Sequence, residues 1–144
     1  MKNNKRYALI STFNKSGLKQ ICTNFKKNNI SIITTGATGR YIKKNGFKCL
    51  AVENLTRFKE ILDGRVKTLH PKIYASLLFK RENKQHVKTF DTLNFPKIDF
   101  VIINLYPFKK TINKKSKIDE CIEMIDIGGP SLMRAAAKNF NDVT

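Results

Sequence analysis

The chain has 144 residues, of which 41% are apolar, and this is enough to bury the core of one domain. It has no run of eighteen apolar residues and no apolar leader at its start, so the sequence predicts neither a membrane span nor export, and we expect a cytoplasmic protein. The net charge of +17 attracts phosphate groups, but no zinc-finger or aromatic RNA-binding motif accompanies it, and lysines among Asn and Ile are typical of A/T-rich codons, so nucleic acid is not an expected partner.

Strand and helix patterns alternate along the first third of the chain. Residues 7–12 predict a strand, and residues 18–25 carry apolar side chains at helical spacing, with Ser16 as the expected N-cap. Residues 30–35 predict a second strand. A turn and a short helix over residues 36–45 follow it.

The same alternation continues with weaker signals. Residues 48–52 predict a third, weak strand, and residues 58–62 predict a helical segment. Residues 80–94 are polar and predict a surface helix or loop. The clearest strand covers residues 99–106, which are apolar on both alternations, as in a strand covered on both faces. Two amphipathic helices are predicted beyond it, over residues 118–125 and 130–140.

This order predicts one α/β domain over residues 1–144, with an open, mainly parallel sheet flanked by helices. Ligands of such sheets bind beyond the carboxyl ends of the strands. The expected strand ends, residues 11–12, 34–35 and 104–106, carry hydroxyl, amide and phenol groups, so we expect a polar site along that edge.

The three cysteines, Cys22, Cys49 and Cys121, are widely spaced and odd in number. They have no metal-ligand spacing and cannot all form disulfides within one chain, so no metal site is predicted. Cys22 and Cys121 fall within helical apolar patterns and are expected to be small buried residues in a reducing compartment.

Residues 34–38, TTGAT, stand between a strand and a helix. Backbone N–H groups at a helix start together with threonine hydroxyls can bind phosphate, and Lys15 adds a cation at the same edge. Such a turn is also common for reasons of shape alone. The sequence leaves both interpretations open.

Residues 63–71, DGRVKTLHP, bring an Arg, a Lys, a Thr and a His into one loop bounded by Gly and Pro. Arg65 offers a planar fork for phosphate or carbonyl groups, and Lys67 offers a mobile proton donor. His70 is typical of a structural hydrogen-bonding residue. Taken by itself, the loop fits a solvated basic turn as well as a site.

Residues 126–130, DIGGP, place a carboxylate just before a helix. Asp126 fits an ordinary helix-start acid as well as a proton carrier. Lys138 lies on the expected helix among small alanines, where it either projects inward or reaches outward into solvent.

Several segments together resemble one family, the IMP cyclohydrolase domain of bifunctional purine biosynthesis proteins. The motifs that carry the resemblance are ALISTFNKSG at 8–17, TGAT at 35–38, DGRVKTLHP at 63–71, NLYPF at 104–108, IDIGGP at 125–130 and RAAAKN at 134–139. They occur in the family's order and run from about residue 7 to the last residue.

The resemblance implies a methylglyoxal-synthase-like, Rossmann-like three-layer fold and the closure of 5-formamidoimidazole-4-carboxamide ribotide to IMP with loss of water. It implies no metal and no organic cofactor. The partner would be this purine ribotide, and a homodimer is expected for the full-length protein. By this resemblance, the catalytic residues are Lys67, Tyr106, Asp126 and Lys138. The residues expected to bind substrate are Ser11, Asn14, Lys15, Thr35, Gly36, Ala37, Thr38, Arg65, Thr68, Asn104, Leu105, Ile127 and Gly128.

The sequence departs from the family pattern in three respects. Phe13 and Asn14 stand where the family has Ser and Asp, and Ala37 replaces the second Gly of a pair, which is tolerated only at negative φ. The family domain also continues past the final motif and is followed by a transformylase domain. We therefore expect a shortened copy of the cyclohydrolase domain.

Two other functions are compatible with these residues. One is a methylglyoxal-synthase-like module, or inactive remnant, that binds a phosphorylated ligand without turnover, which needs the phosphate pocket alone. The other is a basic nucleic-acid-binding protein, whose affinity would fall steeply with salt.

Overall fold

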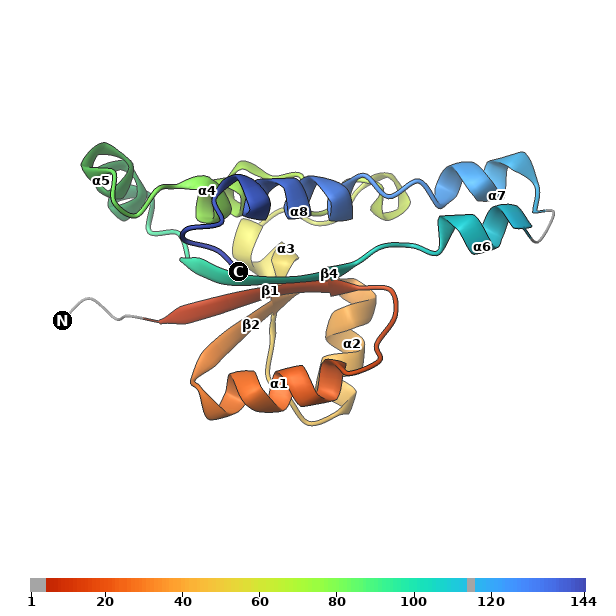
Figure 1. Cartoon of the computed structure of the whole chain (residues 1–144), viewed down its shortest axis with the longest axis horizontal. Helices are drawn as coiled ribbons and strands as arrows, with labels where there is room; N and C mark the ends of the chain where they lie inside the picture. The colour runs from red at the N-terminus through yellow and green to blue at the C-terminus, as the bar shows by residue number, and fades with distance from the viewer. Residues whose placement is uncertain (1–4, 114–115) are drawn as a thin grey trace.

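A parallel β-sheet forms the centre of the molecule, and the computed structural model describes residues 5–113 and 116–144 (Figure 1). Within that part of the chain the sheet has four strands in the order β3-β2-β1-β4, and every pairing is parallel. The strands are β1 (Arg6–Thr12), β2 (Ile30–Thr34), β3 (Leu50–Ala51) and β4 (Ile98–Asn104).

Helices cover both faces of this sheet, which gives three layers (Figure 1). One face carries α1 (Leu18–Lys27) and α2 (Gly36–Lys44). The other carries α3 (Val52–Thr56), α4 (Pro71–Leu78) and α8 (Gly128–Lys138). The remaining elements are a 3-10 turn, η1 (Leu62–Gly64), then α5 (Lys84–Leu93), α6 (Phe108–Asn113) and α7 (Ile118–Glu123). In Figure 1, α6 and α7 lie side by side and extend beyond the end of β4.

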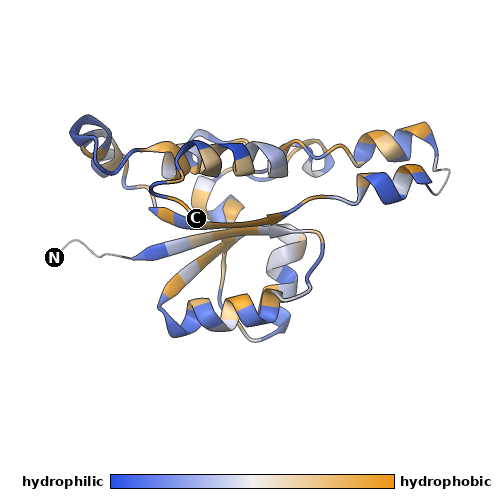
Figure 2. Ribbon diagram, viewed as in Figure 1, coloured by the Kyte–Doolittle hydropathy of each residue, from blue (hydrophilic) through white to orange (hydrophobic). Residues whose placement is uncertain are grey.

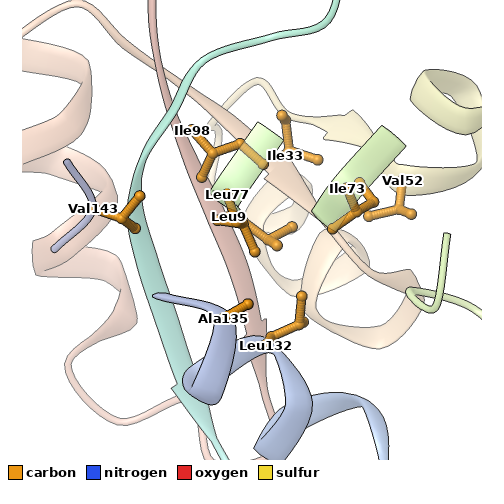
Figure 3. Packing of buried hydrophobic residues seen from close by; sticks show 9 residues of the cluster. All are labelled: Leu9, Ile33, Val52, Ile73, Leu77, Ile98, Leu132, Ala135 and Val143. Atoms are coloured by element: carbon orange, nitrogen blue, oxygen red, sulfur yellow. The ribbon is translucent and has the colours of Figure 1, made fainter. Parts of the chain in front are cut away.

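The alternation of side chains along the strands builds one core on each face. In β1, Leu9 faces α4 and α8, whereas Ala8 and Ile10 face α1 and α2, as the two-residue period of a strand requires. Figure 3 shows the first core, in which Leu9 packs with Leu77 of α4 and Leu132 of α8. Because both faces of β1 are covered, the strand is apolar throughout its centre.

The expected fold class is confirmed: a parallel open sheet flanked by helices. The strands predicted over residues 7–12, 30–35 and 99–106 correspond to β1, β2 and β4. The helices predicted over 18–25 and 36–45 correspond to α1 and α2. The two last predicted helices correspond to α7 and α8, and the polar segment 80–94 contains α5.

Three local predictions differ from the structure. The strand at 48–52 shrinks to the two residues of β3, because Val52 already begins α3. No α-helix forms over residues 58–62: residues 58–60 have no regular secondary structure, and Ile61 pairs with Val66 in an antiparallel bridge. Leu62, which begins η1, has a φ of 53°, a value that right-handed helices exclude. The N-cap of α1 is Gly17 rather than Ser16.

Three further residues can be compared with the surroundings expected for them. His70 is the N-cap of α4, where its Nδ1 accepts a hydrogen bond from the Lys72 N–H at 3.1 Å, so the structural interpretation of this histidine is confirmed. Cys22 is buried in the core, as expected, but Cys121 is only partly buried.

Apolar residues concentrate in the sheet, and the outward sides of α1 and α5 are hydrophilic (Figure 2). Among the helices that the structure describes, none combines the length and the apolar character needed to cross a bilayer.

Candidate active site

The carboxyl ends of β1, β2 and β4 open onto a cleft of about 640 Å³. Register places Thr12 of β1 beside Asn104 of β4, and Ile10 beside Thr34 of β2, so the loops after these strands meet at one edge. The segment around η1, the end of α7 and the start of α8 also line the cleft. This is the edge at which ligands bind in open parallel sheets.

Hydroxyl groups line the side of the cleft next to α2. The Ser11 and Thr35 hydroxyls lie 3.0 Å apart, and the Thr38 hydroxyl donates to the Thr12 carbonyl at 3.0 Å. Thr35 is the N-cap of α2 but its side chain makes no capping hydrogen bond. The first N–H groups of α2, at Gly36, Ala37 and Thr38, have no carbonyl within the helix to bind, so this end favours an anion.

Lys15 stands at the same end of the cleft. Its Nζ donates to the Phe13 carbonyl at 2.8 Å and to the Thr12 carbonyl, which holds the ammonium group beside the end of β1. Burial lowers the pKa of Lys15, because removal from water disfavours the charged form. An anion bound at α2 would offset that cost.

The loop after η1 supplies two more cations, and each is paired with a carboxylate. Lys67 Nζ lies 2.7 Å from Glu60 Oε2. The Arg65 guanidinium makes a two-pronged pair with Glu123 of α7. This hydrogen-bonded pair raises the pKa of Arg65 and lowers that of Glu123.

The start of α8 fits tightly against the same loop. The Asp126 carboxylate accepts a hydrogen bond from the Gly129 N–H at 2.8 Å, so it binds one of the free N–H groups at the start of α8 while it lines the cleft. A Cβ on Gly128 would lie only 2.9 Å from the Thr68 hydroxyl, and one on Gly129 would lie 2.7 Å from a Leu105 methyl. The paired glycines therefore allow close contact between three segments.

Asn104 holds the loop after β1. Its Oδ1 accepts from the Phe13 and Asn14 N–H groups at 2.6 and 2.9 Å, and its Nδ2 donates to the Asn14 carbonyl at 2.8 Å. The amide of Asn104 is thus engaged with backbone. Asn14 and Leu105 line a second cavity of about 680 Å³, which shares Phe13, Lys15 and Asn104 with the cleft.

The structure brings most of the predicted site residues together. Those lining the cleft are Lys67, Tyr106, Asp126, Ser11, Lys15, Thr35, Ala37, Thr38, Arg65, Thr68, Asn104, Ile127 and Gly128. Gly36 lies between two lining residues, and Ala37 lies in the first turn of α2 with negative φ, so its replacement of a glycine is tolerated.

Lys138 does not line this cleft. It is the last residue of α8, ten residues beyond Gly128, which corresponds to about 15 Å along a helix axis. Its side chain is exposed, so of the two orientations that the sequence left open the structure has the outward one.

The sequence did not point to Glu60 and Glu123, the carboxylates that pair with the cleft cations. Glu123 resembles any solvated acid on an amphipathic helix, and its partner lies 58 residues earlier in the chain. Its role depends on where α7 lies, which no local signal indicates. In the described ranges we also find no group of His, Cys, Asp or Glu side chains able to hold a metal ion.

Comparison with protein families gives a match over residues 17–131, which is most of the chain, to the MGS-like domain. The chain belongs to the MGS-like domain family. This MGS-like domain is 53% identical over 137 residues to the bifunctional purine biosynthesis protein PurH of Oenococcus oeni, a match that covers 94% of the chain and 27% of the relative. It is 48% identical to PurH of Caldicellulosiruptor saccharolyticus, with coverage of 95% and 27%.

The MGS-like domain thus spans about a quarter of the length of these curated relatives. Among solved structures, it superposes on the crystal structure of ForH with a TM-score of 0.79, covering 97% of this chain and 71% of that one at 24% identity. At that identity the superposition shows the fold alone.

Proposed function

We propose that this chain carries the IMP cyclohydrolase site, which closes 5-formamidoimidazole-4-carboxamide ribotide to IMP with loss of water. The observation that supports it is a single cleft that joins Lys67, Tyr106 and Asp126 to the uncapped start of α2. The identity to bifunctional purine biosynthesis proteins over nearly the whole chain supports the same reaction.

The phosphate of the ribotide would bind at the start of α2. There Thr35 and Thr38 contribute hydroxyls, the first turn contributes N–H groups, and Lys15 contributes a positive charge. The ribose and base would then extend along the cleft toward Lys67 and Asp126. Both reacting groups belong to one molecule, so holding them in contact supplies much of the rate.

Ring closure forms one C–N bond and expels one water. The carboxamide nitrogen attacks the formyl carbon and gives up one proton, and the formamide nitrogen gives up a second. The former formyl oxygen takes up both protons and leaves as water. The site therefore needs a group that stabilises the oxyanion and groups that move two protons.

Lys67 would stabilise the oxyanion, and groups in this role lower the barrier by roughly 3–4 kcal/mol. Its present partner is the carboxylate of Glu60, which the substrate would have to displace or share. Asp126 and Tyr106 would move the protons. The catalytic role expected for Lys138 stays a prediction. The structure places this residue at the far end of α8, away from the other three catalytic candidates.

The test is to incubate the purified chain with the formylated ribotide and to follow the absorbance of IMP. We expect turnover in the parent, and a loss of about a hundredfold or more in Lys67→Ala and in Asp126→Ala, with IMP binding partly kept. Lys26→Ala, on the exposed side of α1, is the matched control. Turnover equal to that of the parent in the Lys67 and Asp126 variants would contradict these roles.

A phosphorylated-ligand-binding module is the second candidate. The pairing of Arg65 and Lys67 with carboxylates, and the distance of Lys138, favour binding without turnover. Calorimetric binding of IMP by a chain that leaves the formylated ribotide unchanged would support this candidate instead.

A further inference from the structure

Two aromatic rings meet at the mouth of the cleft. The Phe13 and Tyr106 ring centroids lie 5.6 Å apart with an interplanar angle of 79°, an edge-to-face contact. Both side chains line the cleft, and both are about half exposed, at 50% and 45%. A phenylalanine this exposed contributes little to the core, and its specific partner in the structure is the Tyr106 ring.

The backbone of Phe13 is held firmly. Its N–H donates to Asn104 Oδ1 at 2.6 Å, and its carbonyl accepts from Lys15 Nζ at 2.8 Å. Asn104 also ends β4, two residues before Tyr106, and pairs in register with Thr12 of β1. The two rings are therefore carried by neighbouring strand ends that one amide group ties together.

Tyr106 has fewer constraints of its own. Across residues 5–113 and 116–144, its hydroxyl makes no hydrogen bond, so its ring is held by packing alone. A half-exposed tyrosine without such packing samples several rotamers. The Phe13 ring is the aromatic neighbour that restricts it.

We propose that Phe13 is a positioning residue, which fixes the Tyr106 ring so that the phenol faces the ribotide. The inference rests on the proposed function, because it concerns the Tyr106 hydroxyl as a proton carrier there. Phe13 itself exchanges no proton. It reduces the number of ring orientations from which the hydroxyl reaches the reacting atoms.

The test is a double-mutant cycle on the full chain, with the formylated ribotide as substrate. Phe13→Ala should lower kcat about three- to tenfold, as the strength of edge-to-face pairs implies, and should leave KM nearly unchanged. Phe13→Tyr keeps an aromatic edge and should restore turnover. In a Tyr106→Phe background, which lacks the hydroxyl, Phe13→Ala should have no further effect.

Phe140→Ala, at an exposed phenylalanine after α8, is the matched control. An equal loss from Phe13→Ala with and without the Tyr106 hydroxyl would overturn the proposal, and so would a loss confined to KM. Thermal unfolding of each variant separates these results from a loss of fold.

A second measurement keeps this inference separate from the proposed function. NMR of ring-labelled tyrosine, with and without IMP, should show greater mobility of the Tyr106 ring in Phe13→Ala than in the parent. If the parent fails to cyclise the ribotide but the Tyr106 ring is still more mobile in Phe13→Ala than in the parent, the cyclohydrolase proposal is refuted, whereas the restriction of the Tyr106 ring by Phe13 is supported. Equal ring mobility in both proteins would overturn the positioning role.

Discussion

Lys15 combines a positive charge with partial burial, and both matter for an anionic ligand. Its ammonium group rests against two backbone carbonyls at the end of β1, beside the start of α2. Burial lowers its pKa, so it loses its charge at a lower pH than an exposed lysine does. The charged form is the one that attracts phosphate.

Affinity for IMP should therefore fall on the alkaline side, as the pH rises through the lowered pKa of Lys15. Lys15→Arg, whose guanidinium stays charged throughout, should keep its affinity to higher pH. Calorimetric titration with IMP from neutral to alkaline pH measures both curves. Identical alkaline limits for the two proteins would show that Lys15 does not contact the phosphate.

The pair between Arg65 and Glu123 occupies the guanidinium that is expected to bind substrate. Because the pKa of Glu123 is lowered, the carboxylate stays ionised, and the pair persists, as the pH falls through the range where an ordinary Glu becomes protonated. A ligand that needs Arg65 competes with this carboxylate throughout the neutral range.

Glu123→Gln should thus strengthen IMP binding about two- to fivefold, in line with the strength of exposed ion pairs. Asp119→Asn, which removes an equal charge from the exposed side of the same helix, is the control. Dissociation constants from calorimetry compare the three proteins. Equal strengthening in both variants would indicate a general charge effect and no specific competition.

At the scale of elements, the start of α8 depends on two glycines. A side chain on Gly129 would lie 2.6 Å from Asp126 Oδ2 and 2.7 Å from Leu105 Cδ2, distances that real Cβ atoms do not adopt. The start of α8, Leu105 after β4 and the Asp126 carboxylate would have to separate. Gly36, at the start of α2, has only one neighbour near a Cβ, at 3.9 Å.

Gly129→Ala should lower the free energy of unfolding by about 1–3 kcal/mol, as overpacking does. Gly36→Ala should be neutral or stabilising by up to about 1 kcal/mol, because alanine suits a helix better than glycine. Urea unfolding measures both. Equal free energies of unfolding for the two variants would mean that the start of α8 can shift without cost. The position of Asp126 beside Gly129 would then not be fixed by close packing.

At the scale of the whole molecule, polar contacts connect the helical layer of α3, α4 and α8 to the sheet and connect α4 to α8. The Asp99 carboxylate accepts from the Tyr7 N–H and from Arg81, which joins β1, β4 and the segment after α4. The Asn139 amide donates to the carbonyls of Leu77 and Phe79 at 2.8 and 3.1 Å, which joins the ends of α8 and α4.

Asn139→Ala should cost about 1–3 kcal/mol of unfolding free energy, because two carbonyls lose their partner in the interior. Asn141→Ala, two residues further along and exposed, should change it by less than about 0.5 kcal/mol. Denaturant unfolding of both variants gives the comparison. Equal losses would show that the joint between α4 and α8 carries little stability.

The surface of the molecule also bears on the homodimer that the sequence led us to expect. Ile118, Ile122 and Ile125, in and after α7, are 73%, 45% and 54% exposed. Figure 2 shows apolar colour on this projecting pair of helices. Dimerisation stays a prediction, since exposure by itself does not identify what covers these side chains.

The sequence by itself determined the strands β1, β2 and β4, the helices α1, α2, α7 and α8, and the edge at which the site lies, because these follow from local periodicity and from the chemistry of strand ends. It did not identify α3, α4 or α6 as helices. It also identified most of the residues that line the cleft, through motifs of contiguous residues. It failed at residues 58–62, where it indicated a helix but Ile61 pairs with Val66 in an antiparallel bridge and Leu62 has a positive φ.

Only the tertiary structure decided how the charges of the cleft are paired and which way Lys138 points. Arg65 meets Glu123, and Phe13 meets Tyr106, across 58 and 93 positions of the chain. Such contacts depend on the placement of whole elements, set by the packing of both cores, and residues so far apart carry no periodic signal of their meeting.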